Sequence, residues 1–300
     1  MYLLIVKEPM SDNFIGMFWA FGTSILAAIQ VVILSKPLKV LGHLAATILT
    51  NVVNFLILFT LGVITYETGQ ISLKGLFWFG LLGVLAYSFG RYVFYRALWE
   101  LGPPRLTTIV STAPFYGIIL AILFLGEDPN YLLVIGTVLV VSGVVLVSYE
   151  RTDKSFFQKG IAWAFLSAFL ISLSIFIRKI GLESMPNPFL TVAWSNFIGL
   201  LTLFGMKRFI DPDLYRWAGS KVIFLVLIAA VLNSISQFCM NYSVMYGDVS
   251  VVTPIITSSP IFSLLLTAIF LRRSERIRMT MVFGVFVTVF GMILIGFSQT

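Results

Sequence analysis

Apolar residues run along the chain in stretches of about 18 to 25, separated by short polar connections. Each stretch is long enough to cross a hydrocarbon core of about 30 Å at the helical rise per residue. The stretches are apolar on all faces and lack the period-two alternation of a membrane barrel. We therefore predict an all-α polytopic membrane protein with ten transmembrane helices, over residues 14–34, 43–65, 75–99, 105–125, 130–149, 160–180, 188–206, 221–246, 250–271 and 279–297.

Composition supports a membrane protein and limits its chemistry. Hydrophobic residues make up 59% of the chain and charged residues 11%, where a soluble domain carries roughly 25% charged residues. Cys239 is the single cysteine, which excludes disulfides within the chain and thiolate metal clusters. No cluster of His, Asp and Glu suits a metal, and no glycine-rich loop suits ATP hydrolysis. We expect no metal and no cofactor.

The net charge of +7 could indicate an acidic partner, so the location of the charges matters. Basic residues gather toward one face, and only Arg91 lies too deep inside a predicted span to be assigned to either face. The positive-inside rule places the richer face in the cytoplasm and both termini outside. The excess is a topology signal, and we expect no nucleic-acid partner. The cytoplasmic set is Lys36, Lys39, Arg96, Arg105, Arg151, Lys154, Lys159, Lys207, Arg208, Arg216, Lys221, Arg272, Arg273, Arg276 and Arg278, and the outer set is Lys7, Lys74, Arg178 and Lys179.

The two halves of the chain align as an internal repeat. An offset of 146 residues pairs Pro114 with Pro260, and an offset of 145 pairs Asn51 with Asn196. Each half holds five predicted spans, an odd number, so the second half enters the membrane with the opposite orientation. We predict two inverted five-helix repeats, 14–149 and 160–297, around a central cavity. Inverted repeats of this kind support alternating access.

Two stretches carry a family resemblance: "STAPFYGIILAILFLGE" (residues 111–127), which closes the fourth span, and the glycine-marked "VIGTVLVVSGVVLV" (residues 134–147). They resemble the EamA-type repeats of the drug/metabolite transporter superfamily. The resemblance implies ten helices, a cavity between the repeats, and export or exchange of small metabolites. One feature departs from it, because Glu127 has Arg273 as its counterpart in the second half.

Arg91 is the charge that needs a reason, because an arginine at mid-membrane costs about 2.5–3.5 kcal/mol even on insertion scales. It lies roughly 12 Å along a helix from Trp99, so its side chain could snorkel toward the headgroups. Alternatively it faces a cavity. Tyr87, Ser88 and Tyr95 lie beside it at helical spacing, and this polar, aromatic stripe is poor lipid contact.

The repeat extends this stripe to other spans. The offset sends Tyr87, Ser88, Arg91 and Tyr95 to four further polar residues, and Trp19, Thr23 and Gln30 map onto Trp163, Ser167 and Ser174. Each residue alone could serve as interhelical hydrogen-bonding glue; four matched stripes favour a cavity. Asn51, Asn54 and Asn196 are either glue or gating contacts. The candidate substrate-binding residues are Arg91, Tyr95, Tyr87, Gln237, Asn241, Asn233, Trp19, Gln30, Trp163 and Ser167.

Prolines and glycines predict local geometry. Pro114 and Pro260 remove backbone donors mid-helix and should bend the fourth and ninth spans, as static kinks or as hinges. Gly136 with Gly143, and Gly284 with Gly291, recur at seven-residue spacing. We interpret these four glycines as close contacts between helices.

No acidic residue lies in the middle of a predicted span, so a proton-coupled exporter of cationic drugs lacks its carboxylate. A buried arginine instead suits a ligand with a carboxylate or other anionic group. We expect a transporter that exports small metabolites by alternating access, first amino acids or related organic acids. The alternatives are an organic-phosphate or nucleotide-sugar carrier, a multidrug exporter, a membrane-embedded enzyme, and a purely structural subunit. The expected partners are a small-molecule substrate and the lipid bilayer of a prokaryotic plasma (inner) membrane, with the chain as monomer or homodimer.

Overall fold

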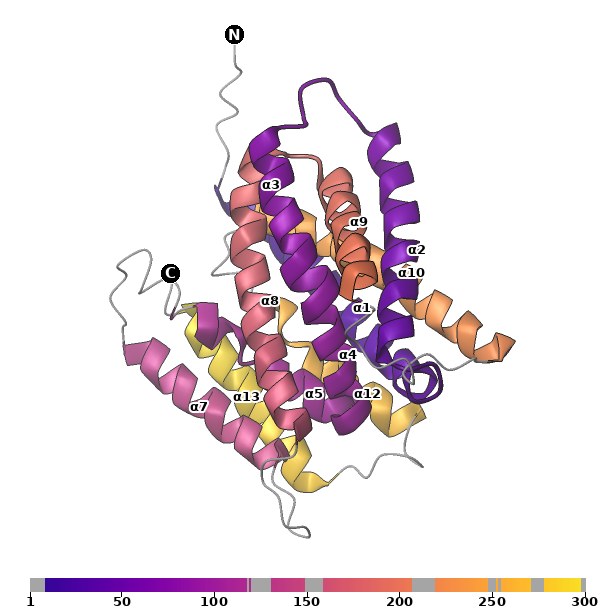
Figure 1. The fold of residues 1–300 in the computed structure, drawn as a ribbon. Helices are drawn as coiled ribbons and strands as arrows, with labels where there is room; N and C mark the ends of the chain where they lie inside the picture. Colours follow the sequence, from indigo (N-terminus) through magenta and orange to yellow (C-terminus); the bar gives the residue numbers. More distant parts are fainter. Residues whose placement is uncertain are drawn as a thin grey trace.

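The computed structural model describes residues 9–117, 119, 131–148, 159–206, 219–247, 252, 255–270 and 278–297. Within these ranges every regular element is a helix (Figure 1). The helices are α1 (Pro9–Leu41), α2 (His43–Ile64), α3 (Leu73–Leu82), the π-helix η1 (Gly83–Gly90), α4 (Arg91–Leu101), α5 (Pro103–Val110), α7 (Tyr131–Ser148), α8 (Lys159–Ser184), α9 (Pro188–Met206), α10 (Ser220–Tyr246), α12 (Ser259–Phe270) and α13 (Met279–Phe297).

Each of the ten predicted spans coincides, wholly or in part, with described helices. Among the described residues, six helical segments are long and apolar enough to cross a membrane, including His43–Ile64 and Ser220–Tyr246. Most of the second half of the fourth span and the beginning of the ninth lie outside the described residues. The all-helical membrane fold predicted from the sequence is confirmed.

The first span is longer than its apolar pattern indicated. It was predicted to end at residue 34, but α1 continues to Leu41 and includes Pro37. The apolar pattern weakens at Ser35 and Lys36 while the helix continues. Hydropathy indicates whether side chains suit lipid or water, and it does not indicate where a helical backbone ends. The helix ends at Gly42, whose φ of 85° is a conformation that favours glycine.

The third span is one segment of 29 residues, Leu73–Leu101, but it is not a uniform helix. Ser72 caps its start by accepting a hydrogen bond from the Gly75 amide at 3.0 Å. The middle, Gly83–Gly90, is a π-helix, a form that is rare and that occurs frequently at functional sites. The α-helical pattern resumes at Arg91. The π-helix therefore ends directly before Arg91, the charged residue that the sequence singled out.

Helix contacts repeat between the halves as the sequence offset requires. Helix α1 packs along α10, and its counterpart α8 packs along α3, η1 and α4, which are the counterparts of α10. The matched helices α2 and α9 pack on each other, and so do α7 and α13, which lie side by side at one edge of the molecule (Figure 1). The internal repeat thus governs the packing as well as the sequence.

Close packing of α7 on α13 explains the glycine spacing. A Cβ added at Gly143 would lie 2.6 Å from the Gly284 carbonyl oxygen, and one at Gly291 would lie 2.7 Å from the Gly136 carbonyl oxygen. Neither distance is sterically possible for a Cβ atom. The prediction that these four glycines mark a close helix contact is confirmed, and it holds symmetrically for both helices.

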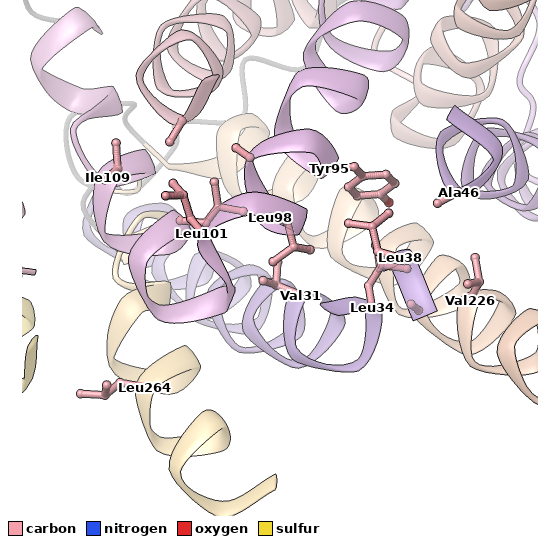
Figure 2. Close-up of a cluster of buried hydrophobic side chains, with 14 of the residues drawn as sticks. Val31, Leu34, Leu38, Ala46, Tyr95, Leu98, Leu101, Ile109, Val226 and Leu264 are labelled. Atoms are coloured by element: carbon pink, nitrogen blue, oxygen red, sulfur yellow. The ribbon is translucent and has the colours of Figure 1, made fainter. Parts of the chain in front are cut away.

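The apolar interior forms two clusters. One surrounds α1 and α4 and includes Val31, Leu34, Leu98 and Ile109 (Figure 2). The other lies among α3, η1, α8, α9 and α10, and Phe79 is one of its fully buried members. Tyr95 belongs to the first cluster and Tyr87 to the second, two turns away on the same span. The polar residues described next lie where the two clusters meet.

Candidate substrate-binding site

A cavity of about 190 Å³ lies between the two halves of the protein. Helices α1, η1, α4, α5, α8 and α10 line it, together with residues around the start of α12. Its walls combine apolar side chains such as Phe94 and Leu170 with a set of polar ones. The polar lining residues are Thr23, Gln30, Tyr87, Arg91, Tyr95, Thr107, Ser167, Ser174, Arg178, Asn233, Ser236, Gln237, Thr257 and Ser259.

Arg91 lies inside the helix bundle at the wall of this cavity and is only 8% exposed. Its Nη1 donates to the side-chain oxygens of Asn51 and of Asn196, the latter at 3.2 Å. Its Nη2 donates to Asn233 Oδ1 at 3.1 Å. These three bonds use neutral amide oxygens, so the guanidinium keeps its positive charge uncompensated. The structure places the side chain toward the bundle interior and not toward the headgroups.

Arg178 is a second arginine at the same cavity, and its predicted position on the outer face is wrong. It was assigned to an outer connection, but α8 continues to Ser184 and Arg178 is 2% exposed. It therefore lies about 9 Å inside the end of its helix. Its Nη1 donates to Asn241 Oδ1, and its Nη2 donates to the Tyr87 hydroxyl and to Gln237 Oε1, both at 3.0 Å. The count of outer basic residues overestimated that face accordingly.

Tyr87 connects the two arginines. Its ring lies beneath Arg91, with 4.9 Å from the guanidinium carbon to the ring centroid, a cation–π distance. Its hydroxyl accepts from Arg178 and donates to Gln237 Oε1 at 2.9 Å. Tyr87 belongs to the π-helix, and its backbone carbonyl accepts a hydrogen bond from Asn51 Nδ2 at 2.7 Å. Asn51 therefore forms hydrogen bonds both to the Arg91 guanidinium and to the π-helix that precedes Arg91 in the chain.

Tyr95 lies one helical turn beyond Arg91 and forms hydrogen bonds with neutral side chains. Its hydroxyl accepts from Gln30 Nε2 at 3.2 Å and shares a hydrogen bond with Thr50 Oγ1 at 3.1 Å. Gln30 in turn accepts from Asn233 Nδ2 at 2.9 Å. This chain of hydrogen bonds joins α1, α2, α4 and α10, so it fixes the acceptor orientation of the amides around Arg91.

Three of the predicted binding residues do not line the cavity. Trp19 packs against Phe238, with ring centroids 5.3 Å apart. Trp163 lies under the guanidinium of Arg96 at 4.7 Å, away from the cavity. Asn241 supports Arg178 from behind and donates to the Pro188 carbonyl at 2.6 Å. None of the three is among the residues that line the cavity, so the repeat offset alone did not identify which side chains reach it.

Prolines interrupt the spans on the cavity's α5 and α12 sides. Helix α5 stops at Val110 and a turn follows at Ser111–Thr112, just before Pro114. A matching turn at Thr257–Ser258 precedes Pro260. The two breaks touch, because Ser111 Oγ donates to the Thr257 carbonyl at 2.8 Å, and these residues are 146 apart. Repeat-matched positions therefore meet beside the cavity, and whether they act as hinges stays a prediction.

Asn51, Asn54 and Asn196 are functional candidates that the sequence analysis left undecided. All three are fully buried, and the side-chain amide of Asn54 lies 2.7 Å from Asn233 Oδ1. Asn51 on α2 and Asn196 on α9 match each other in the repeat, and this match was a usable signal in the sequence. Two matched amides close to the axis that relates the repeats can both face one cation. Arg178 left no such signal, since its position in the first half is occupied by Leu34.

Chemically, the arrangement suits recognition of an anion. Both guanidinium groups present planar forks that match carboxylate and phosphate geometry. Neither forms a salt bridge within the described part of the chain, where the Arg96–Glu100 pair at 3.4 Å lies on the helix surface instead. The Nε of Arg178 is buried and finds no acceptor among the described residues. The site thus holds positive charge and unused donors.

Comparison with known proteins places the chain in a family. The model of the EamA-like transporter family matches residues 14–149 and 158–297. A solved structure titled "Crystal structure of protein" shares 15% sequence identity and a TM-score of 0.68, covering 95% of this chain and 96% of its own, so it supports the fold alone. A search of curated proteins finds no match. The chain belongs to the EamA-like transporter family, and it is a membrane transporter and not an enzyme.

Proposed function

We propose that the protein exports small organic anions by alternating access, with amino acids and related organic acids as the first substrates to test. The observation that carries the proposal is the pair of buried arginines at one cavity, Arg91 and Arg178, which form no salt bridge within the described residues. A buried charge without a counter-charge is costly. A substrate carboxylate would stabilise it through charge-assisted hydrogen bonds.

The size of the cavity favours a small substrate. Its volume of about 190 Å³ lies below the roughly 300 Å³ at which sites for drug-sized ligands begin. An amino acid or a short organic acid suits this space better than a nucleotide sugar does. The apolar wall, including Val31, Phe94 and Leu170, would contact the carbon part of such a molecule.

A second candidate function is transport of a small organic phosphate. A single buried arginine would disfavour an organic-phosphate carrier, because carriers of phosphate esters usually need more than one buried cation. Arg178 supplies the second cation at the same cavity. A multidrug exporter of cations is disfavoured for the same reason, since both arginines would repel its substrate.

The repeat supports alternating access about this site. Acceptors for Arg91 come from α2 of the first repeat and from α9 and α10 of the second. Such bonds would be exchanged when the repeats move relative to each other around a central substrate. We place the protein in the plasma (inner) membrane of a prokaryote, with both termini outside, as the distribution of basic residues favours.

The decisive test is transport by the full chain in liposomes, against a panel of amino acids, organic acids, sugar phosphates and cationic drugs. Arg91→Gln should lower the affinity for the transported anion by roughly tenfold to a hundredfold. Arg91→Lys should restore it only in part, because an ammonium lacks the planar two-point geometry. Both variants should insert and purify like the wild type.

Arg96→Gln is the matched control. Arg96 lies on the same span, five residues from Arg91, but it pairs with Glu100 outside the cavity. Its substitution should leave the affinity for the anion unchanged. Undiminished transport by Arg91→Gln, or uptake of cationic drugs only, would contradict the proposal.

A further inference from the structure

Arg178 is more deeply buried than any charge the sequence analysis anticipated. It is the largest fully buried side chain in the described part of the protein. Three of its bonds go to Asn241, Tyr87 and Gln237, while its buried Nε finds no acceptor among the described residues. A stabilising role alone would favour a fully satisfied guanidinium. The remaining donor capacity and the position at the cavity wall indicate a ligand.

The two guanidinium groups flank one side chain without merging into one site. Arg91 stacks on the face of the Tyr87 ring, and Arg178 donates to the hydroxyl at the end of that ring. Each arginine has its own acceptor amides, Asn51 and Asn196 for Arg91, and Asn241 for Arg178. The cavity therefore carries two positive groups, one at the face of the Tyr87 ring and one at its hydroxyl.

We propose that Arg91 and Arg178 form two anion subsites of one cavity, and that the transported molecule carries two negative charges. The ligand class is a short dicarboxylate or a small phosphate ester, which share this charge and the planar or tetrahedral oxygens that arginine forks bind. The inference rests on the proposed function and narrows its substrate class. Neutral amino acids become poor substrates, because their ammonium group would lie near a cation without an acidic partner in the described residues.

The charges at the cavity support two anionic groups over one. A ligand with a single carboxylate would neutralise one arginine and leave the other buried and unpaired. A dianion neutralises both, and the two repel each other less once it is bound. The apolar lining of the same cavity, which includes Ala86 and Phe94 from the span that carries Arg91, suits a short carbon chain.

Binding of matched probes to the purified full chain tests the inference. Succinate and butyrate have the same carbon number and differ by one carboxylate, and glycerol 3-phosphate provides the phosphate arm. The wild type should bind the dianions roughly tenfold to a hundredfold more tightly than butyrate. Arg178→Gln should abolish this preference while butyrate binding stays unchanged. Arg91→Gln should weaken binding of all three probes.

Two further variants keep the test decisive. Lys179→Gln removes the neighbouring charge, whose Nζ contacts the Val244 carbonyl at 3.4 Å and does not line the cavity, so the preference should persist. If Arg178→Gln does not fold, Arg178→Lys retains the charge and should reduce the preference several-fold through the lost fork geometry.

The outcomes separate this inference from the proposed function. If the wild type binds none of the three probes but transports amino acids in the liposome panel, only the two-subsite inference is overturned; if it also transports no amino acid, organic acid or sugar phosphate, the proposed function itself is contradicted. If it binds them but does not prefer dianions, or if the Arg178 variants leave the preference intact, only the two-subsite inference is overturned. A preference for succinate over glycerol 3-phosphate assigns a dicarboxylate, and the reverse order assigns a phosphate ester.

Discussion

The third span of the first repeat and its counterpart in the second, α10, occupy matching places but carry different chemistry. The third span contains a π-helix and a cation, Arg91. Helix α10 is a continuous α-helix from Ser220 to Tyr246, and its matching residue is Gln237. The positions that match Tyr87 and Tyr95 are likewise amides, Asn233 and Asn241.

The contacts explain why the difference is useful. The α10 amides do not form a second, equal site; their oxygens accept from the arginines, Asn233 from Arg91, and Gln237 and Asn241 from Arg178. The repeat thus gives a symmetric frame, and the charges break the symmetry of the site built on it. A fully symmetric copy would bring further arginines into one buried space, where like charges repel.

Substitutions in the contact between α7 and α13, one helix from each repeat, should have the largest effect on stability. The loss should be equal for either helix. Gly143→Leu and Gly291→Leu each force side-chain atoms against a backbone carbonyl of the partner helix. We expect each to lower the free energy of unfolding by roughly 3 kcal/mol. Thermal unfolding followed by size-exclusion chromatography measures this. Gly205→Leu is the control, since nothing lies within 4 Å of an added Cβ there.

Unequal losses of unfolding free energy in the two glycine variants would contradict a symmetric contact between the repeats. A frame governed by the repeat requires that α7 and α13 contribute alike to their shared contact.

The matched asparagines should respond unequally, although both accept from Arg91. Asn51 also donates to the Tyr87 carbonyl in the π-helix, whereas Asn196 donates to Val192 in its own helix at 2.7 Å. Asn51→Ala should cost about 3 kcal/mol and Asn196→Ala about half of that. Paired melting curves and anion-binding isotherms of the two variants measure the difference. Equal losses would mean that the π-helix does not depend on Asn51.

A smaller contrast concerns Tyr95 and its match Asn241. Tyr95→Phe removes only neutral hydrogen bonds, to Gln30 and Thr50, and should cost about 1 kcal/mol. Asn241→Ala removes an acceptor from Arg178 and should cost about 2 kcal/mol. Anion affinity should fall only in Asn241→Ala. A larger loss of affinity in Tyr95→Phe would assign the contact with substrate to Tyr95.

The orientation of the two repeats can be tested without any cost in stability. The connection at residues 65–72 and its repeat match at 207–218 should lie on opposite sides, outside and cytoplasmic, because the repeats are inverted. Single cysteines introduced at these places can be labelled from each side, and the native Cys239 is buried. Tags at Met1 and Thr300 should both report outside. Labelling of both connections from one side would make the repeat parallel.

The sequence by itself determined the membrane frame. Apolar runs of sufficient length, the 146-residue offset and the paired glycines depend on local composition and on positions along the chain. They therefore predicted the helices, the repeat and a close helix contact at the glycines. The sequence also identified Arg91, because a charge in an apolar run is visible without coordinates.

Only the tertiary structure decided what surrounds the charge. Arg178 stands near the end of its apolar run, where hydropathy cannot tell a buried side chain from a solvated one. The extra turn of α8 and the packing of α10 against the third span brought it to the cavity. The π-helix left no pattern in the residues. It coincides with contacts from distant parts of the chain, the close approach of Gly83 to the Ser195 carbonyl and the hydrogen bond from Asn51 to the Tyr87 carbonyl. Acceptors from α2, α9 and α10 converge on one arginine through contacts 40 to 142 residues apart in the chain, and such long-range convergence is set by packing and not by local sequence.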